Sequence, residues 1–117
     1  MDHPISGQVI LLAGAKASVP LERLPRLLER VAVHVDAERA SYERRFERVA
    51  VDDERSVYLV PRGHWTEVGE AVELAPRETD AVRRAHEEQF LRLGRQTGRR
   101  EEFEHALDIR EAVVVAD

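Results

Sequence analysis

Three residues in the C-terminal third have side chains that could hold a metal ion. Glu102 and His105 stand three positions apart, which puts a carboxylate and an imidazole on one face of a helix. Di-iron bundles use two such pairs with two further carboxylates, and this sequence offers one pair. His86 is the third candidate ligand. Metal or small-molecule binding near His86, Glu102 and His105 is therefore one hypothesis, and a solvated helix face is its alternative.

His86 also has a structural interpretation. It lies on an apolar helical stripe between Val82 and Phe90. A histidine in that position is typically half-buried and hydrogen-bonded to a neighbour. What His86 faces is the main question that the sequence leaves open.

An arginine-rich segment suggests a second chemistry, nucleic-acid binding. Residues 76–100 contain seven arginines and four acidic residues, whereas the whole chain has a net charge of −5. A helix-turn-helix over residues 64–93 would use these arginines as DNA contacts: Arg77, Arg83, Arg84 and Arg95. However, Arg83 lies four residues before Glu87 and Arg84 four before Glu88, spacings that form intrahelical ion pairs. The alternative is an exposed amphipathic helix.

The same region resembles two helix-turn-helix families. "TEVGEAVEL" followed by "RE", "VRR" and "LRL" resembles the promoter-reading end of bacterial sigma factors, and "LAPRETDAV" resembles the start of the LuxR-type domain. The two resemblances assign the recognition role to different helices. Glu73 also occupies the turn position where such motifs usually place glycine. DNA binding is therefore possible from the sequence but disfavoured.

No catalytic constellation assembles along the chain. The sequence has no cysteine, no glycine-rich phosphate loop and no GxSxG motif. Arg62 and His64 precede a predicted helix and could meet an anion there, with capping as the alternative. We expect no cofactor and no enzymatic activity.

The elements around these candidates predict a mainly helical α+β fold. Hydrophobic spacing favours five to six helices in a compact bundle, at about residues 7–16, 24–35, 37–45, 64–73, 76–93 and around Phe103. Two β-prone runs flanking Asp52–Arg55 predict a small hairpin near residues 46–60. Residues 112–116 predict a strand that joins this hairpin or pairs with another chain.

Local signals refine the helices. Ser6 can cap the first helix, and Ile5 and Ile10 are spaced for a hydrophobic staple. That helix is apolar nearly all round, which predicts a central position. Asp36 is predicted to cap the third helix. The second helix has the clearest buried stripe: Leu21, Leu24, Leu28, Val31 and Val35.

Composition limits the class of protein. The 117 residues suit a single domain over residues 1–117, and 17 of the 18 basic residues are arginine. The longest uncharged stretch, residues 4–15, is too short to span a bilayer. The start, Met1-Asp2-His3-Pro4, lacks the basic residues of a signal peptide. We expect a cytoplasmic protein with no membrane partner.

Across nearly its whole length the chain resembles a family of small, lysine-poor, uncharacterised proteins from halophilic archaea. The segments that carry this resemblance are "DHPI", "LERLPRLLERV", "YLVPRGHW", "AVRRAHEEQ" and "LGRQTGRREEFEHALDIREAVVV". The resemblance implies a salty cytosol, where short screening lengths weaken binding by charge alone. The leading hypothesis is a non-enzymatic protein-interaction domain that binds itself as a homodimer or binds another protein.

Overall fold

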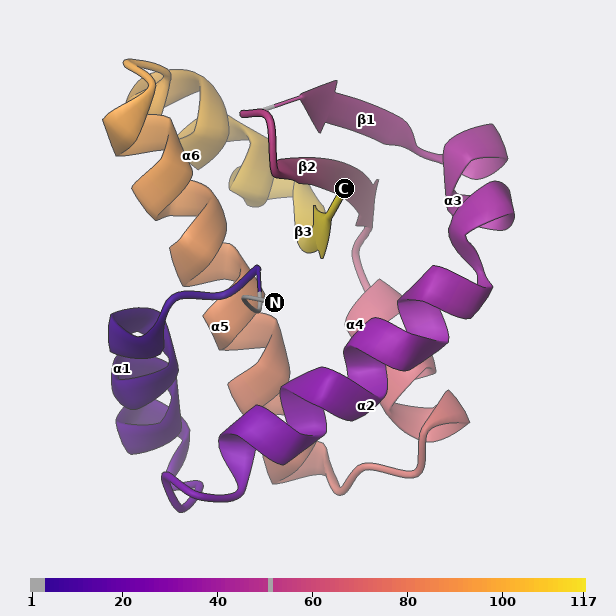
Figure 1. The fold of residues 1–117 in the computed structure, drawn as a ribbon, viewed down its shortest axis with the longest axis vertical. Coiled ribbons are helices and arrows are strands. Elements are labelled where there is room, and N and C mark those ends of the chain that lie inside the picture. The colour runs from indigo at the N-terminus through magenta and orange to yellow at the C-terminus, as the bar shows by residue number, and fades with distance from the viewer. Residues whose placement is uncertain (1–3, 51) are drawn as a thin grey trace.

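The computed structural model describes residues 4–50 and 52–117. It contains six helices and three strands in the order α1 (Gly7–Ala17), α2 (Leu24–Ala37), α3 (Arg39–Arg45), β1 (Glu47–Ala50), β2 (Arg55–Pro61), α4 (His64–Ala71), α5 (Pro76–Gln96), α6 (Arg100–Ile109) and β3 (Arg110–Ala116). Figure 1 shows the helices arranged around one small sheet. The predicted class, mainly helical with a hairpin and a C-terminal strand, is confirmed.

The long helix α5 lies at the centre of the fold and contacts α1, α2, α4, α6 and β3 (Figure 1). Its predicted stripe of Val82, Ala85, His86, Phe90 and Leu93 is buried. The prediction that the first helix is central is therefore wrong. Helix α1 lies at the periphery: Ala13 and Ala17 face the core, whereas Leu11 and Leu12 are more than half exposed.

Helices α1 and α2 begin largely as the sequence predicts. The Ser6 hydroxyl accepts a hydrogen bond from the Val9 backbone N–H, and Ile5 is buried. Helix α2 carries Pro25 in its first turn, where the missing N–H costs nothing. Its stripe is buried from Leu24 onward, whereas Leu21 lies before the helix and is exposed.

Two helix ends differ from prediction. Asp36 does not cap the third helix; it lies inside α2, which continues to Ala37, and α3 begins after Glu38 without a side-chain cap. The fifth helix does not end near Leu93 as predicted, because α5 continues through Gly94 to Gln96. A Cβ at Gly94 would lie 2.8 Å from the ring of Phe103, so this glycine lets α5 and α6 pack closely.

The sheet has the order β1-β2-β3 and is antiparallel throughout. In its register Val57 lies opposite Val49 on one side and Val114 on the other. The C-terminal strand thus pairs within the chain. Every residue of β2 from Ser56 to Val60 is buried, so both faces of this central strand are covered, whereas Glu47 and Arg48 of β1 are exposed. None of the helices in the described ranges is long and apolar enough to cross a membrane.

Candidate functional site in the groove between α2 and α4

His86 faces the outer edge of the sheet. Its Nδ1 accepts a hydrogen bond of 2.9 Å from the backbone N–H of Val114, and its ring packs against Trp65 with centroids 4.6 Å apart. Only an imidazole nitrogen without a proton can accept, so in the neutral ring the proton is on Nε2. His86 therefore satisfies a backbone N–H of the edge strand β3.

Two other side chains complete the cover of that edge. The indole N–H of Trp65 donates to the Ala112 carbonyl, and Arg39 donates to the Ala116 carbonyl. Because alternate residues of a strand direct their backbone groups to the same side, Ala112, Val114 and Ala116 all face away from β2. The edge strand is therefore protected against pairing with another chain.

The structure separates the three metal-ligand candidates. His86 is buried at the strand edge, Glu102 pairs with Arg99 at 2.6 Å, and His105 is exposed. Among the described residues, no three histidine, aspartate or glutamate side chains are placed to share a metal ion. Each of the three therefore has a local environment of its own.

The arginine candidates are largely neutralised within α5. Arg83 pairs with Glu87 at 2.8 Å, as its spacing of four residues predicts, and also with Asp80 at 2.6 Å. Arg84 pairs with Asp80, not with the predicted Glu88.

Glu88 instead lies 3.7 Å from Lys16 of α1. Arg77 and Arg95 are exposed. The predicted turn position, Glu73, does adopt a left-handed backbone with φ of 58° despite its side chain. The backbone at Glu73 thus adopts the turn conformation of a helix-turn-helix. In the helix that follows, however, Arg83 and Arg84 are engaged in ion pairs.

A different region offers a binding site, the groove between α2 and α4. Figure 1 shows α2 crossing in front of α4. One half is a cavity of about 570 Å³, whose described lining is Glu29, Arg30, Val33, His34, Ala71, Val72 and Glu73. The other half is a pocket of about 220 Å³ lined by His34, Glu38, Ser41, Tyr42, Arg45, His64, Glu67, Val68 and Ala71. Since His34 and Ala71 line both, the two form one continuous surface, here called the α2–α4 groove.

The open half of the groove has an apolar wall. Val33 is 62% exposed although it is a β-branched apolar residue in the middle of α2. Val72 and Ala71 lie opposite it at the end of α4. Arg30 donates to the Val72 carbonyl and so connects the two helices at this end.

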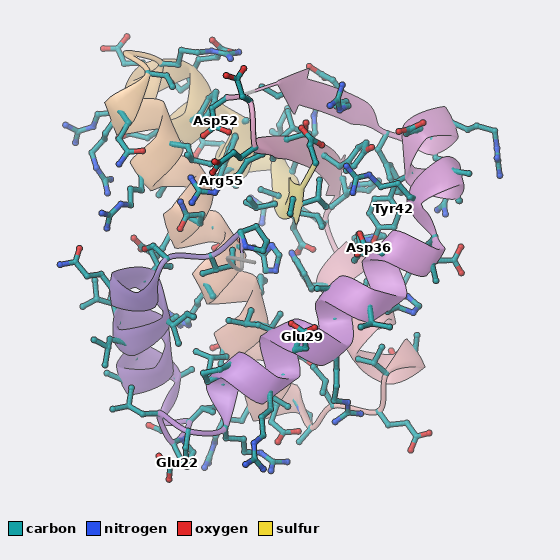
Figure 2. All side chains as sticks on the ribbon, viewed as in Figure 1. Glu22, Glu29, Asp36, Tyr42, Asp52 and Arg55 are labelled. Carbon is teal, nitrogen blue, oxygen red and sulfur yellow. The ribbon has the colours of Figure 1, made fainter. Side chains whose placement is uncertain are left out.

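The polar half is built around a buried pair, Tyr42 and His64. The Tyr42 hydroxyl lies 2.5 Å from His64 Nε2, and the two rings meet edge to face with centroids 5.3 Å apart. Figure 2 shows Tyr42 pointing inward from α3. Phe46 packs against both rings. The aromatic contacts fix the orientation of the imidazole.

The position of His64 is fixed because hydrogen bonds to β3 and α6 hold the start of α4 in place. Gly63 precedes the helix with φ of 92°, a conformation that favours glycine. The Glu111 carboxylate of β3 accepts hydrogen bonds from the backbone N–H groups of Gly63 and Trp65, which satisfies the helix start. Arg62 donates to the Asp108 carbonyl at the end of α6.

Burial sets the protonation of the pair. It lowers the pKa of His64 below its ordinary 6.5, against the opposing field of the Glu67 carboxylate. Burial also raises the pKa of Tyr42 to about 12. Both shifts favour the neutral form of each side chain at pH 7.

The rim of the groove is acidic. In the part of the chain that the structure describes, its four carboxylates make no ion pair: Glu29, Glu38, Glu67 and Glu73. Arg45 opposes them at one end, where it stacks over Phe46 at 4.7 Å and lies 3.4 Å from the Ser41 hydroxyl. Elsewhere on the surface acidic residues are commonly paired with arginine, as Asp80 and Glu87 are.

Sequence reasoning identified His64 but not its setting. The lining comes from segments 29–45 and 64–73, which share no motif or periodicity that would connect them. The one available signal was Val33, an apolar residue on the face of α2 opposite the stripe.

Comparison with known proteins gives a family without an assigned activity. A family model described as "Domain of unknown function (DUF8048)" matches residues 3–117. No curated protein and no solved structure matches the chain. Because the family match covers nearly the whole length, the chain belongs to the DUF8048 family.

Proposed function

We propose that this domain is a non-enzymatic interaction domain that binds a short segment of a partner protein in the α2–α4 groove. The observation that carries the proposal is the exposed Val33 beside a set of unpaired carboxylates in a cavity of about 570 Å³. Apolar grooves between helices commonly accept amphipathic segments.

Charge indicates the chemistry of that segment. The groove has four unpaired carboxylates, one unpaired guanidinium at Arg45, and Arg30 bonded to a backbone carbonyl. Complementary charge steers partners and excludes wrong ones. The favoured partner is thus a segment with apolar residues for the wall at Val33 and basic residues for the rim.

The protonation of the buried pair supports binding over catalysis. A general base or acid works best with a pKa near the operating pH. Burial moves the pKa of His64 down from 6.5 and that of Tyr42 up to about 12, so both move away from neutrality. The pair is suited to shaping a pocket.

Short synthetic peptides test the groove. A leucine–lysine peptide added to the labelled protein should shift the amide NMR signals of Val33, Ala71 and their neighbours. A leucine–glutamate peptide of the same length should not. Titration calorimetry then measures the affinity for the basic peptide.

Matched variants locate the binding surface. Val33→Lys should weaken binding of the basic peptide by about tenfold or more, since it removes an apolar contact and adds like charge. Leu12→Lys on α1 is the control, because Leu12 is also exposed, at 55%. Equal effects of the two variants, or shifts confined to another surface, would contradict the proposal. Sedimentation of the protein alone distinguishes a partner chain from self-association.

A further inference from the structure

The polar half of the groove contains an acceptor that the chain does not use. His64 is 8% exposed and lines the 220 Å³ pocket. Its Nε2 is occupied by Tyr42, whereas its Nδ1 makes no hydrogen bond to the residues that the structure describes. Among the described residues the buried side-chain atoms without a hydrogen bond are Arg39 Nε and Tyr58 Oη, so His64 Nδ1 is open to the pocket. There it can accept a hydrogen bond from a bound group.

The charges around this pocket come from three elements. Glu38 lies at the junction of α2 and α3, and Glu67 lies on α4, so carboxylates stand on two walls. Both are close enough to act on the Tyr42 hydroxyl electrostatically. Arg45 of α3 is the opposing charge, and it is drawn to one side by its stack on Phe46.

Two further groups face the histidine. Glu111 of β3 lies toward the ring but is held by the backbone of α4. His34 of α2 lines the pocket beside it. Two carboxylates with no partner therefore remain against one guanidinium.

We propose that this pocket takes a cationic side chain, lysine or arginine, from the bound segment. The cation lies between the Glu38 and Glu67 carboxylates, and His64 Nδ1 is a third acceptor. This inference rests on the proposed function of the groove, because the segment supplies the side chain. Its aliphatic stem passes Val68 and Ala71, which line the same pocket.

The tautomer of His64 gives the inference a specific signature. The 2.5 Å contact persists in both tautomers, because Nε2 can accept from the Tyr42 hydroxyl or donate to its oxygen. A cation needs the lone pair of Nδ1. Binding therefore selects the tautomer in which the proton is on Nε2.

A small probe tests the pocket without a peptide. Nα-acetyl-lysine methylamide is titrated into ¹⁵N-histidine-labelled protein at constant pH above 7, and the ring nitrogens of His64 are followed. We expect a shift that reports a bare Nδ1, and no shift with the norleucine analogue. Unmoved His64 nitrogens at saturating probe would overturn the inference.

Carboxylate variants add a matched comparison. Glu67→Gln and Glu38→Gln should each weaken the response to the lysine probe, since each removes half of the negative charge. Glu70→Gln is the control, because Glu70 is exposed on the same helix and faces the α4–α5 side. An equal loss in all three variants would assign the response to general charge and contradict the pocket.

Peptides separate the two proposals. If the leucine–lysine peptide binds, replacing its lysines one at a time by norleucine should weaken binding by about three- to tenfold at one position. That position should lose its effect in Glu67→Gln. If no position stands out, the pocket inference fails while the groove remains. If no peptide binds, the groove proposal fails, and the small probe still decides the pocket.

Discussion

Two buried histidines in this fold do different work. His86 lies in the centre of α5 and His64 at the start of α4, and they are 4% and 8% exposed. Each ring packs against aromatic neighbours, Trp65 for His86 and Tyr42 with Phe46 for His64. The difference lies in the partner of the ring nitrogen.

His86 bonds to a backbone N–H, whereas His64 bonds to a side chain. The N–H of Val114 belongs to an edge strand and has no other strand to bond to, so His86 replaces a missing neighbour. The Tyr42 hydroxyl is one of several polar groups around a pocket. The comparison teaches that burial and aromatic contact alone do not distinguish a structural histidine from one at a binding surface.

Removing His86 should give the largest loss of stability. His86→Leu leaves the buried Val114 N–H without its acceptor, which costs about 2 kcal/mol. Thermal or urea unfolding measures the loss. His105→Leu is the control, because His105 is exposed and its replacement should change stability by less than about 0.5 kcal/mol.

A conservative variant separates the hydrogen bond from packing. His86→Asn offers an oxygen near the position of Nδ1 and should recover part of the loss. If His86→Leu is as stable as the wild type, His86 does not protect the strand edge and the contrast with His64 disappears.

Removing the Tyr42 hydroxyl should have a smaller effect. Tyr42→Phe keeps the ring contacts and removes the bond to His64, for a loss of about 1 kcal/mol. A double-mutant cycle with His64→Phe checks the origin of this loss by comparing unfolding free energies. An equal cost of Tyr42→Phe in both backgrounds would show that the pair does not interact.

Much of the fold could be predicted from the sequence because it depends on local signals. The spacing of Leu24, Leu28, Val31 and Val35 defined α2, and the polar turn near Asp52 defined the hairpin. The central position predicted for α1 failed for a physical reason. A helix that is apolar along most of its length need not be buried all round, and Leu11 and Leu12 are both more than half exposed.

The surroundings of His86 and His64 were harder to predict. Their hydrogen-bond partners are either far away in the sequence or backbone groups that no residue type marks. The Val114 N–H that His86 meets is a backbone group, and it would be the same whatever residue stood there. Tyr42 and His64 are 22 positions apart, and they meet because α3 and α4 flank the same hairpin. Such encounters are set by tertiary packing.

The smallest expected effect is the pH dependence that His64 contributes. Its pKa is lowered in the folded state, so below pH 6.5 the unfolded chain binds protons that the folded protein refuses. Its contribution is present above 6.5 and is lost as pH falls toward the lowered value. Tyr42 affects the pH dependence of stability at alkaline pH. Its pKa rises from 10.0 to about 12, so stability is lost as pH climbs through that interval.

His64→Phe should flatten the decline that begins below pH 6.5, above the range in which carboxylates such as Glu78 and Asp80 titrate. Unfolding by urea at several pH values measures both slopes, and His105→Phe controls for the loss of one histidine. An unchanged slope in His64→Phe would mean that burial does not disfavour the charged ring. The ring of His64 would then keep its ordinary pKa of 6.5, so below that pH both ring nitrogens would carry protons and Nδ1 could not accept a hydrogen bond from a cation.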